Sequence, residues 1–312
     1  MRGRKSILTA VIAGSLIAGS AVAVAAQASR LATFDHEAGQ LSEGVAVAQN
    51  GDVYASLSPL GQLVRVAAGS DEPEVVGSLD GLAEGDFGLI GLAVGPDGAV
   101  YGGVVSSVPE LTGVWRFDPD SGDAERVAGT EAIGFANEPA FDDAGNMYVS
   151  DTTAGAVWRV PADGVAEPWI ADPLLEGTGE AGFGFPIGAN GVEVHDGTVY
   201  VGVTETAQLV SVPINADDSA GQAELFAQLP EAVDGIDIDD EGNVYATHPI
   251  ANLVTVTSPA GEVTIIASVD DGLDGPTSVA LGPDGTAYIA NFSVALQTPL
   301  GAGPGIVALG TE

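Results

Sequence analysis

The 312-residue sequence contains no cysteine and, after residue 5, no lysine. The absence of cysteine excludes disulfides, thiolate metal sites and a lipid-anchoring thiol. Beyond residue 28, five arginines oppose 44 carboxylates, which gives this part of the chain a formal charge of −39. Such a charge repels phosphate backbones and anionic lipids, so nucleic acid and membrane surfaces are excluded as partners. Solubility in a salty or acidic exterior, where ions screen the self-repulsion, is sufficient to explain the surplus of acid.

Long apolar runs are absent except near the start of the chain. Arg2, Arg4 and Lys5 precede an uncharged apolar stretch, residues 7–26, which ends in small residues that resemble an A-x-A cleavage site. We interpret residues 1–28 as a signal peptide and expect a secreted, extracellular, monomeric protein comprising residues 29–312. An uncleaved segment would instead anchor the protein at the cell surface, because about 20 apolar residues can cross a bilayer.

Aromatic residues make up only 6% of the sequence, and all six tyrosines follow glycine-containing turns. Glycine, Asn and Asp accept the positive φ that hairpin turns need, and apolar alternation on both sides predicts two strands per turn. In most copies a third strand follows, and a polar turn then leads to a short fourth strand. Four strands at this spacing are typical of a β-propeller blade. The tyrosines are Tyr54, Tyr101, Tyr148, Tyr200, Tyr245 and Tyr288, separated by 47, 47, 52, 45 and 43 residues.

The sixth copy ends at its third strand, Gly305 to Leu309, and lacks a fourth. The stretch from Arg30 to Phe34, just ahead of the first copy, can supply it and remove two open sheet edges. We therefore predict an all-β fold with one domain, a six-bladed β-propeller of four-stranded antiparallel blades whose last blade is closed by the N-terminal strand.

At one position of the repeat, the residue type differs between blades, and several of the residues carry a side-chain oxygen. Counting back 11 residues from each tyrosine, or 10 in the fourth copy with its shorter turn, gives the start of the innermost strand. Propeller symmetry brings these positions together around the central channel. Two carboxylates and two amides among them form an all-oxygen set that suits Ca²⁺ or another divalent cation. Alternatively, the polar residues simply hydrate the channel. The six residues are Glu43, Ile90, Asn137, Asn190, Asp234 and Thr277.

Four segments carry a resemblance to a known family. Ser42-Glu-Gly-Val-Ala-Val, Asn137-Glu-Pro-Ala-Phe-Asp, Gly188-Ala-Asn-Gly-Val-Glu-Val and Val233-Asp-Gly-Ile-Asp-Ile-Asp resemble motifs of the regucalcin (senescence marker protein)/gluconolactonase family. The resemblance implies a six-bladed calcium-dependent hydrolase that opens a lactone or related ester of a small-molecule substrate. It further implies that Asp234 is the catalytic carboxylate, and that the metal ligands are Glu43, Asn137, Asn190 and Asp234.

The sequence departs from the family pattern near Asn137. The N-D motif of the family is Asn137-Glu138 here, which moves a carboxylate by one methylene. Sugar-lactone members tend to carry an arginine two residues before the asparagine, where this chain has Phe135. Loss of that donor disfavours a sugar-acid lactone and favours a more apolar substrate. Phe183 and Phe185 are expected to form one wall of the entrance, and residues 84–87 another.

Two further residues have a functional and a structural interpretation. His248 ends the second strand of blade five and is a candidate pocket residue, although a solvated loop histidine is the simpler expectation. Asp237 could support a second cation, or it could be an inward-facing polar residue. For the whole chain, the alternative to a hydrolase is a non-catalytic exported propeller that binds a partner and keeps the metal for structure. Carbon–carbon bond formation, as in strictosidine-synthase-like propellers, fits less well because those proteins lack this metal set.

Overall fold

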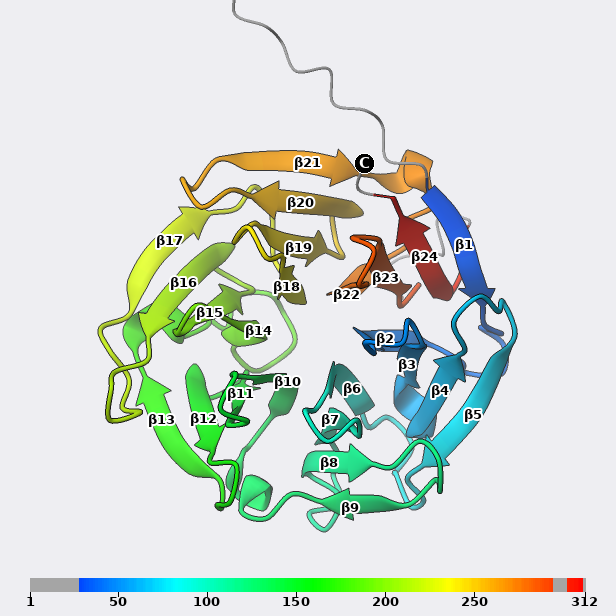
Figure 1. Cartoon of the computed structure of the whole chain (residues 1–312), viewed down its shortest axis with the longest axis horizontal. Helices are drawn as coiled ribbons and strands as arrows, with labels where there is room; N and C mark the ends of the chain where they lie inside the picture. Colours follow the sequence, from blue (N-terminus) through cyan, green and yellow to red (C-terminus); the bar gives the residue numbers. More distant parts are fainter. Residues whose placement is uncertain (1–27, 294–301, 311–312) are drawn as a thin grey trace, which may run out of the picture.

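The computed structural model describes residues 28–293 and 302–310, and nearly all of its regular structure is β-strand. In this part of the chain the strands form six antiparallel sheets of four strands each, arranged as blades around a central axis (Figure 1). In blades one to five the chain enters at the axis and moves outward strand by strand. The predicted six-bladed propeller is confirmed.

The first three blades follow one another in sequence, and each is given from its inner to its outer strand. Blade one contains β2 (Ser42–Val47), β3 (Val53–Leu57), β4 (Gln62–Val66) and β5 (Pro73–Ser78). Blade two contains β6 (Gly88–Val94), β7 (Val100–Val105), β8 (Gly113–Phe117) and β9 (Ala124–Arg126). Blade three contains β10 (Ala136–Phe141), β11 (Met147–Asp151), β12 (Ala156–Val160) and β13 (Glu167–Ala171).

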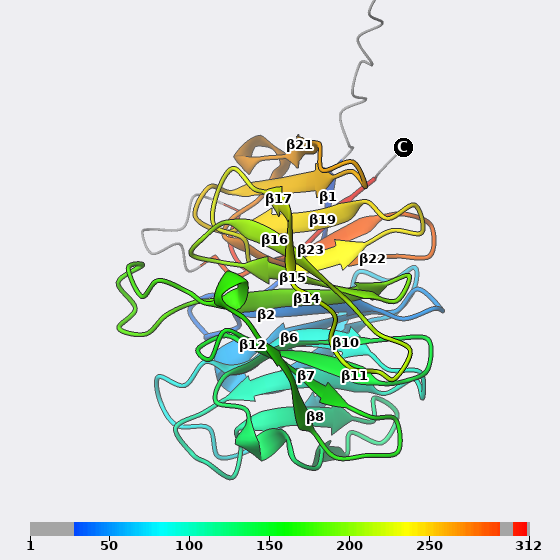
Figure 2. The same ribbon diagram turned by 90° about the vertical axis from the view of Figure 1, so that its left-hand side faces the viewer.

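The remaining blades complete the ring, with the strands spanning it from one face to the other (Figure 2). Blade four contains β14 (Ala189–His195), β15 (Thr198–Val203), β16 (Gln208–Pro213) and β17 (Glu224–Gln228). Blade five contains β18 (Ile236–Ile238), β19 (Val244–His248), β20 (Leu253–Thr257) and β21 (Val263–Ala267). Blade six contains β22 (Pro276–Leu281), β23 (Ala287–Asn291), β24 (Gly305–Leu309) and β1 (Ala28–Thr33). Single 3-10 turns lie in four connections: η1 (Ser58–Leu60), η2 (Thr130–Ala132), η3 (Pro173–Leu175) and η4 (Val269–Asp271).

The N-terminal strand closes the propeller, as the sequence predicts. β1 pairs antiparallel with β24, from Ala28 opposite Leu309 to Thr33 opposite Gly305, and the two lie side by side in Figure 1. Arg30 strengthens the junction by donating a hydrogen bond to the carbonyl oxygen of Gly303 (2.8 Å). Closure gives β24 a partner on both sides and gives β1 a partner on one side. Residues 1–27 of the predicted signal peptide lie outside the described residues, and its last residue, Ala28, begins β1. Among the described residues no helix is long and apolar enough to cross a membrane.

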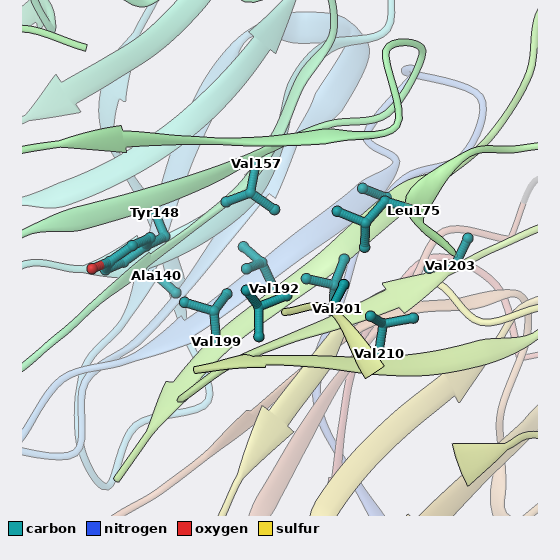
Figure 3. Close-up of a cluster of buried hydrophobic side chains, with 12 residues drawn as sticks. Ala140, Tyr148, Val157, Leu175, Val192, Val199, Val201, Val203 and Val210 are labelled. Atoms are coloured by element: carbon teal, nitrogen blue, oxygen red, sulfur yellow. The ribbon is translucent and has the colours of Figure 1, made fainter. Parts of the chain in front are cut away.

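Apolar clusters between adjacent blades hold the ring together. The cluster between blades three and four is shown in Figure 3. Strand alternation places Val199, Val201 and Val203 of β15 on one face, and all three are fully buried. The repeat residue Tyr148 is also fully buried and packs its ring 5.0 Å from that of Trp169. Each fully buried side chain of this size stabilises the fold by about 1.5–3 kcal/mol, so the blades form a rigid frame for the channel.

Candidate metal centre and active site

The positions selected by the repeat lie where the inner strands are irregular. In blade five, β18 begins only at Ile236, so Asp234 precedes the strand. In the other five blades the pairing of the inner with the second strand shifts register at the equivalent place. Such a bulge redirects a side chain out of the regular alternation. The residues enclosed by the shifts are Glu43, Ile90, Asn137, Asn190 and Thr277.

The next residue is glycine in four blades, because neighbouring inner strands approach closely at this point. A Cβ atom at Gly44 would lie 2.5 Å from the carbonyl oxygen of Ile90, and one at Gly191 would lie 2.5 Å from that of Asp234. The amide of Gly191 donates a hydrogen bond to the same Asp234 oxygen, at 3.0 Å. These contacts between inner strands fix the spacing of the repeat-selected residues around the axis. These six residues are called the ring below: Glu43, Ile90, Asn137, Asn190, Asp234 and Thr277.

The two predicted amide ligands are in direct contact. Asn137 Nδ2 donates a hydrogen bond to Asn190 Oδ1 at 2.6 Å, although the residues are 53 positions apart in sequence. Two threonines orient the pair. Asn137 Nδ2 also donates to Thr152 Oγ1 (3.1 Å), and Asn190 Nδ2 donates to Thr204 Oγ1 (2.9 Å). Both amides are thereby held with their carbonyl oxygens available to a ligand, because an amide oxygen has two lone pairs.

Glu43 and Asp234 supply the two carboxylates of the ring. Oε2 of Glu43 is buried and has no hydrogen-bond partner among the described residues. Burial raises the pKa of Glu43 well above its ordinary value, and the charge of Asp234 raises it further. Burial also raises the pKa of Asp234 to about 7, against an opposing interaction with the side chain of Asn190. Like charges held close together in a low dielectric disfavour each other's ionisation, and a cation between them would relieve both.

The donor set fits a calcium ion. Within residues 28–293 and 302–310, no group of three or more His, Cys, Asp or Glu side chains is arranged to hold a metal. The ring supplies two carboxylates, so amide oxygens must provide the other protein ligands, a mixture that Ca²⁺ accepts. The unpartnered oxygen of Glu43 needs a cation or a donor. Glu43, Asn137, Asn190 and Asp234 are the residues that would hold the ion, and metal binding there stays a prediction.

Glu138 occupies, in blade three, the position that is glycine in four other blades. It is 5% exposed, and its Oε2 accepts a hydrogen bond from the amide of Val192 in blade four, at 3.1 Å. The side chain lines a channel cavity of about 180 Å³ together with Glu193 and Asp237. Burial raises the pKa of Glu138 well above its ordinary value, and the charge of Glu43 adds to the effect. Glu138 therefore faces the channel interior, beside the ring.

Asp237 joins blades five and six. Its Oδ2 accepts a hydrogen bond from the amide of Leu281 at 2.6 Å, and its Oδ1 accepts one from the amide of Ile238 at 2.7 Å. Burial raises the pKa of Asp237 to about 6, although both hydrogen bonds lower it. Backbone donors thus satisfy both oxygens, which favours the inward-facing structural interpretation over a second cation.

The expectation of a solvated His248 is wrong, and the side chain is also unavailable to the pocket. His248 is fully buried at the end of β19. Its Nδ1 lies 3.1 Å from the carbonyl oxygen of Glu231, and its Nε2 lies 2.9 Å from Thr255 Oγ1. Burial lowers the pKa of the imidazole. Both ring nitrogens are occupied within blade five, because the connection that leads to Asp234 covers the end of this strand.

Phe135 belongs to a group of phenylalanines next to the ring. Its ring centroid lies 5.4 Å from that of Phe87 and 5.8 Å from that of Phe185. Phe183 extends the group, at 6.3 Å from Phe185. Asp151 holds the segment before β10 in place by accepting hydrogen bonds from the amides of Gly134 (3.0 Å) and Phe135 (3.2 Å). The two entrance walls expected from the sequence are thus one continuous aromatic surface.

Thr152 and Thr204 are site residues that the sequence reasoning missed. Thr152 lies 15 residues after Asn137, and Thr204 lies 14 residues after Asn190. The turn of blade four is one residue shorter, so the two threonines occupy the same position of the repeat. The count that selected the ring could have found them if it had been extended to the far end of the second strand.

Comparisons with known proteins bear on the family and the fold of the chain. Residues 187–293 match the profile of the family described as SMP-30/Gluconolactonase/LRE-like region, a stretch that includes Asn190 and Asp234. No curated protein sequence matches the chain.

Solved structures show the same fold at low sequence identity. A gluconolactonase from Xanthomonas campestris has a TM-score of 0.70 at 16% identity, with 95% of this chain and 93% of that chain covered. The calcium-binding protein regucalcin from Agrobacterium tumefaciens has a TM-score of 0.62 at 17% identity, with 87% and 90% covered. A virginiamycin B lyase from Staphylococcus aureus has a TM-score of 0.55 at 13% identity, with 85% and 81% covered. The profile match and the propeller together confirm the resemblance to the regucalcin and gluconolactonase-like family that the four motifs indicate.

Proposed function

We propose that the protein is an exported, metal-dependent hydrolase that opens a lactone or a related ester. One observation carries the proposal: Glu43 places a buried, unpartnered carboxylate oxygen beside Asp234 and the hydrogen-bonded pair of Asn137 and Asn190. An all-oxygen ring of this kind, at the start of the inner strands of a rigid channel, suits a divalent cation that also contacts substrate. The gluconolactonase and regucalcin likenesses support this reaction class.

The chemistry follows from what each ring residue can do. A bound Ca²⁺ would supply Lewis-acid polarisation of the substrate carbonyl. Asp234, as the carboxylate, accepts a proton from the attacking water while the new C–O bond forms at the carbonyl carbon. The proton then passes to the endocyclic oxygen of the lactone as the bond between that oxygen and the carbonyl carbon breaks, which leaves a hydroxy acid. Thr152 and Thr204 hold the two amides and so keep the substrate carbonyl in register with Asp234.

Activity and metal binding should be measured on the same protein. The purified protein is assayed against lactones, aryl esters and phosphotriesters, after treatment with a chelator and after return of Ca²⁺, and Ca²⁺ binding is followed by calorimetry. We expect turnover that disappears with the chelator and returns with Ca²⁺. Asp234→Asn should lose turnover and weaken Ca²⁺ binding. Glu125→Gln, on the outermost strand of blade two with its side chain 75% exposed, is the matched control and should change neither.

The outcomes separate the two function classes. Calcium binding that raises the melting temperature, with no chelator-sensitive turnover of any ester, would overturn the hydrolase and leave a propeller that keeps its metal for structure. Turnover that persists unchanged in Asp234→Asn would remove this residue from the mechanism.

The export and the monomeric state are proposals of the same kind. They rest on the N-terminal segment and on the closed ring of blades, in which β1 pairs with β24 of the same chain. Sequencing of the N-terminus of the secreted protein tests cleavage near Ala28, and light scattering tests the oligomeric state.

A further inference from the structure

We propose, building on the proposed hydrolase function, that four phenylalanines form a subsite for the apolar substituent of an uncharged substrate, an alkyl or aryl group attached to the lactone or ester. Phe87, Phe135 and Phe185 contact one another pairwise, with ring centroids 5.4 to 6.4 Å apart. Phe183 packs against Phe185 at 6.3 Å. These separations are those of favourable aromatic pairs, so the rings form one cohesive surface.

The surface lies at the face of the propeller that carries the ring. Phe87 immediately precedes β6 and Phe135 immediately precedes β10, while Phe183 and Phe185 lie on the connection that leads into β14. These are the inner strands of three consecutive blades, and they begin at the face where Asn137 and Asn190 lie. An apolar substituent resting on the phenylalanines would therefore be continuous with a carbonyl group held at the ring.

The outer members of the surface remain open to solvent. Phe87 is 43% exposed and Phe183 is 41% exposed, whereas Phe135 beneath them is 8% exposed. Single exposed apolar residues are normal on a protein surface, as at Leu225 on the outermost strand of blade four. Two exposed phenylalanines joined to one cluster beside a polar ring are different, because a ligand can cover them both at once.

Carboxylates hold each of the aromatic segments in position. Asp86, next to Phe87, accepts hydrogen bonds from the hydroxyl of Ser106 (2.5 Å) and the amide of Ser107 (2.8 Å). Asp151 binds the backbone of Phe135. Glu205 accepts hydrogen bonds from the amides of Gly179 (2.6 Å) and Ala181 (2.9 Å) on the connection that carries Phe183 and Phe185. The aromatic surface is therefore preorganised, which lowers the cost of binding.

The charges around the channel select an uncharged ligand. All five arginines beyond residue 28 lie on the third or fourth strands of their blades, and the inner strands carry none. They are already engaged there, as Arg159 is with Asp218 at 2.7 Å. The ring carboxylates would be engaged with the metal, and no arginine or lysine lies on an inner strand to pair with an anionic substrate such as a phosphate ester or a sugar acid. The apolar surface and the absence of a basic side chain on the inner strands thus point to the same substrate class.

A series of γ-lactones whose alkyl side chain grows from methyl to heptyl tests the subsite, with glucono-δ-lactone as the polar comparison. We expect kcat/KM to rise by about tenfold or more along the series, as extra methylenes gain contact with the aromatic surface. Phe87→Ser and Phe183→Ser should abolish most of that rise, because both side chains form the exposed part of the subsite. Leu225→Ser is the matched control and should leave the rise intact.

Binding of the corresponding alkyl lactams, which are not hydrolysed, separates this inference from the proposed function. Lactam affinity that grows with chain length and falls in Phe183→Ser supports the subsite even when no lactone is turned over. Turnover that is independent of chain length, or unaffected by both substitutions, overturns the subsite and leaves the hydrolase. Binding of phosphatidylcholine vesicles that Phe183→Ser abolishes, without any dependence on chain length, would overturn it in favour of a membrane contact.

Discussion

Replacing Gly191 with alanine should disturb the ring at the point where blades four and five meet. The added Cβ would lie 2.5 Å from the carbonyl oxygen of Asp234 and 2.7 Å from the amide nitrogen of Ile236. An ordinary C···O contact is about 3.3–3.6 Å, so the backbone at Asp234 must move by roughly 1 Å. Overpacking of this kind costs about 1–3 kcal/mol. We expect the melting temperature to fall by about 2–12 °C, since 1 kcal/mol corresponds to about 2–4 °C in a domain of this size class.

The displacement should damage the site more than the fold. A misplacement of about 1 Å at a catalytic group can cost about 100-fold in rate, so turnover should fall by that order even well below the melting temperature. Gly310→Ala is the matched control, because a Cβ there meets nothing within 4 Å. Melting curves, Ca²⁺ calorimetry and lactone turnover are measured on both variants. If Gly191→Ala matches Gly310→Ala in all three, the close approach of the inner strands does not position Asp234.

Three further predictions test other parts of the structure. Thr204→Val removes the acceptor of Asn190 Nδ2 and should weaken Ca²⁺ binding about tenfold. Thr204→Ser keeps a hydroxyl and should retain the affinity of the unsubstituted protein. Equal affinities of all three proteins in calorimetry would remove Thr204 from the site. Burial would raise the pKa of Asp86, but hydrogen bonds from Ser106, Ser107 and Ala83 outweigh it and lower the pKa from its ordinary 3.8 to about 2. Because the folded pKa is the lower one, this stabilisation is present above about pH 4 and is lost as pH falls toward 2. The melting temperature of Asp86→Asn should therefore fall less than that of the unsubstituted protein over this range, and parallel curves would contradict the assignment. Added NaCl should raise the melting temperature, because the screening length falls from about 10 Å at 0.1 M to about 3 Å at 1 M and the chain carries a formal charge of −36; a melting temperature that falls with salt would mean that ion pairs dominate the surface.

The fold was predictable because the same residue types recur at regular spacing along the sequence. Each tyrosine marks the second strand of a blade, so Tyr148 and Tyr245 could be aligned without any knowledge of pairing. The missing fourth strand of blade six was equally visible, and β1 lies where that absence required it. A propeller is favourable for this reasoning because each blade contributes the same positions to the axis, so distance in sequence does not matter.

The details of the site were less predictable because they depend on contacts between different positions of different blades. The burial of His248 depends on how the preceding connection folds over it, which its strand position does not encode. Glu138 reaches across to the amide of Val192 only because the inner strands of blades three and four nearly touch. Asp151 and Glu205 anchor aromatic segments from unequal positions in their blades, so no count along the repeat could have paired them.

The ring positions are nearly symmetric around the axis, but the residues at them are not. The carboxylates, Thr277 and the amides lie on different blades, so one side of the ring differs chemically from the other. Asp234 and Glu43 place their carboxylates on blades five and one, on either side of Thr277, whose hydroxyl is engaged with the carbonyl oxygen of Glu43 at 2.7 Å. The amides of Asn137 and Asn190 occupy blades three and four, which also carry most of the aromatic surface. In the proposed binding mode, a substrate that fills both parts would have a single orientation, with its carbonyl toward the carboxylates and its apolar substituent over the phenylalanines. Because Asp234 and the aromatic surface lie on different blades, substitutions at the surface should change which lactone is preferred, whereas substitutions at Asp234 should change whether any is opened.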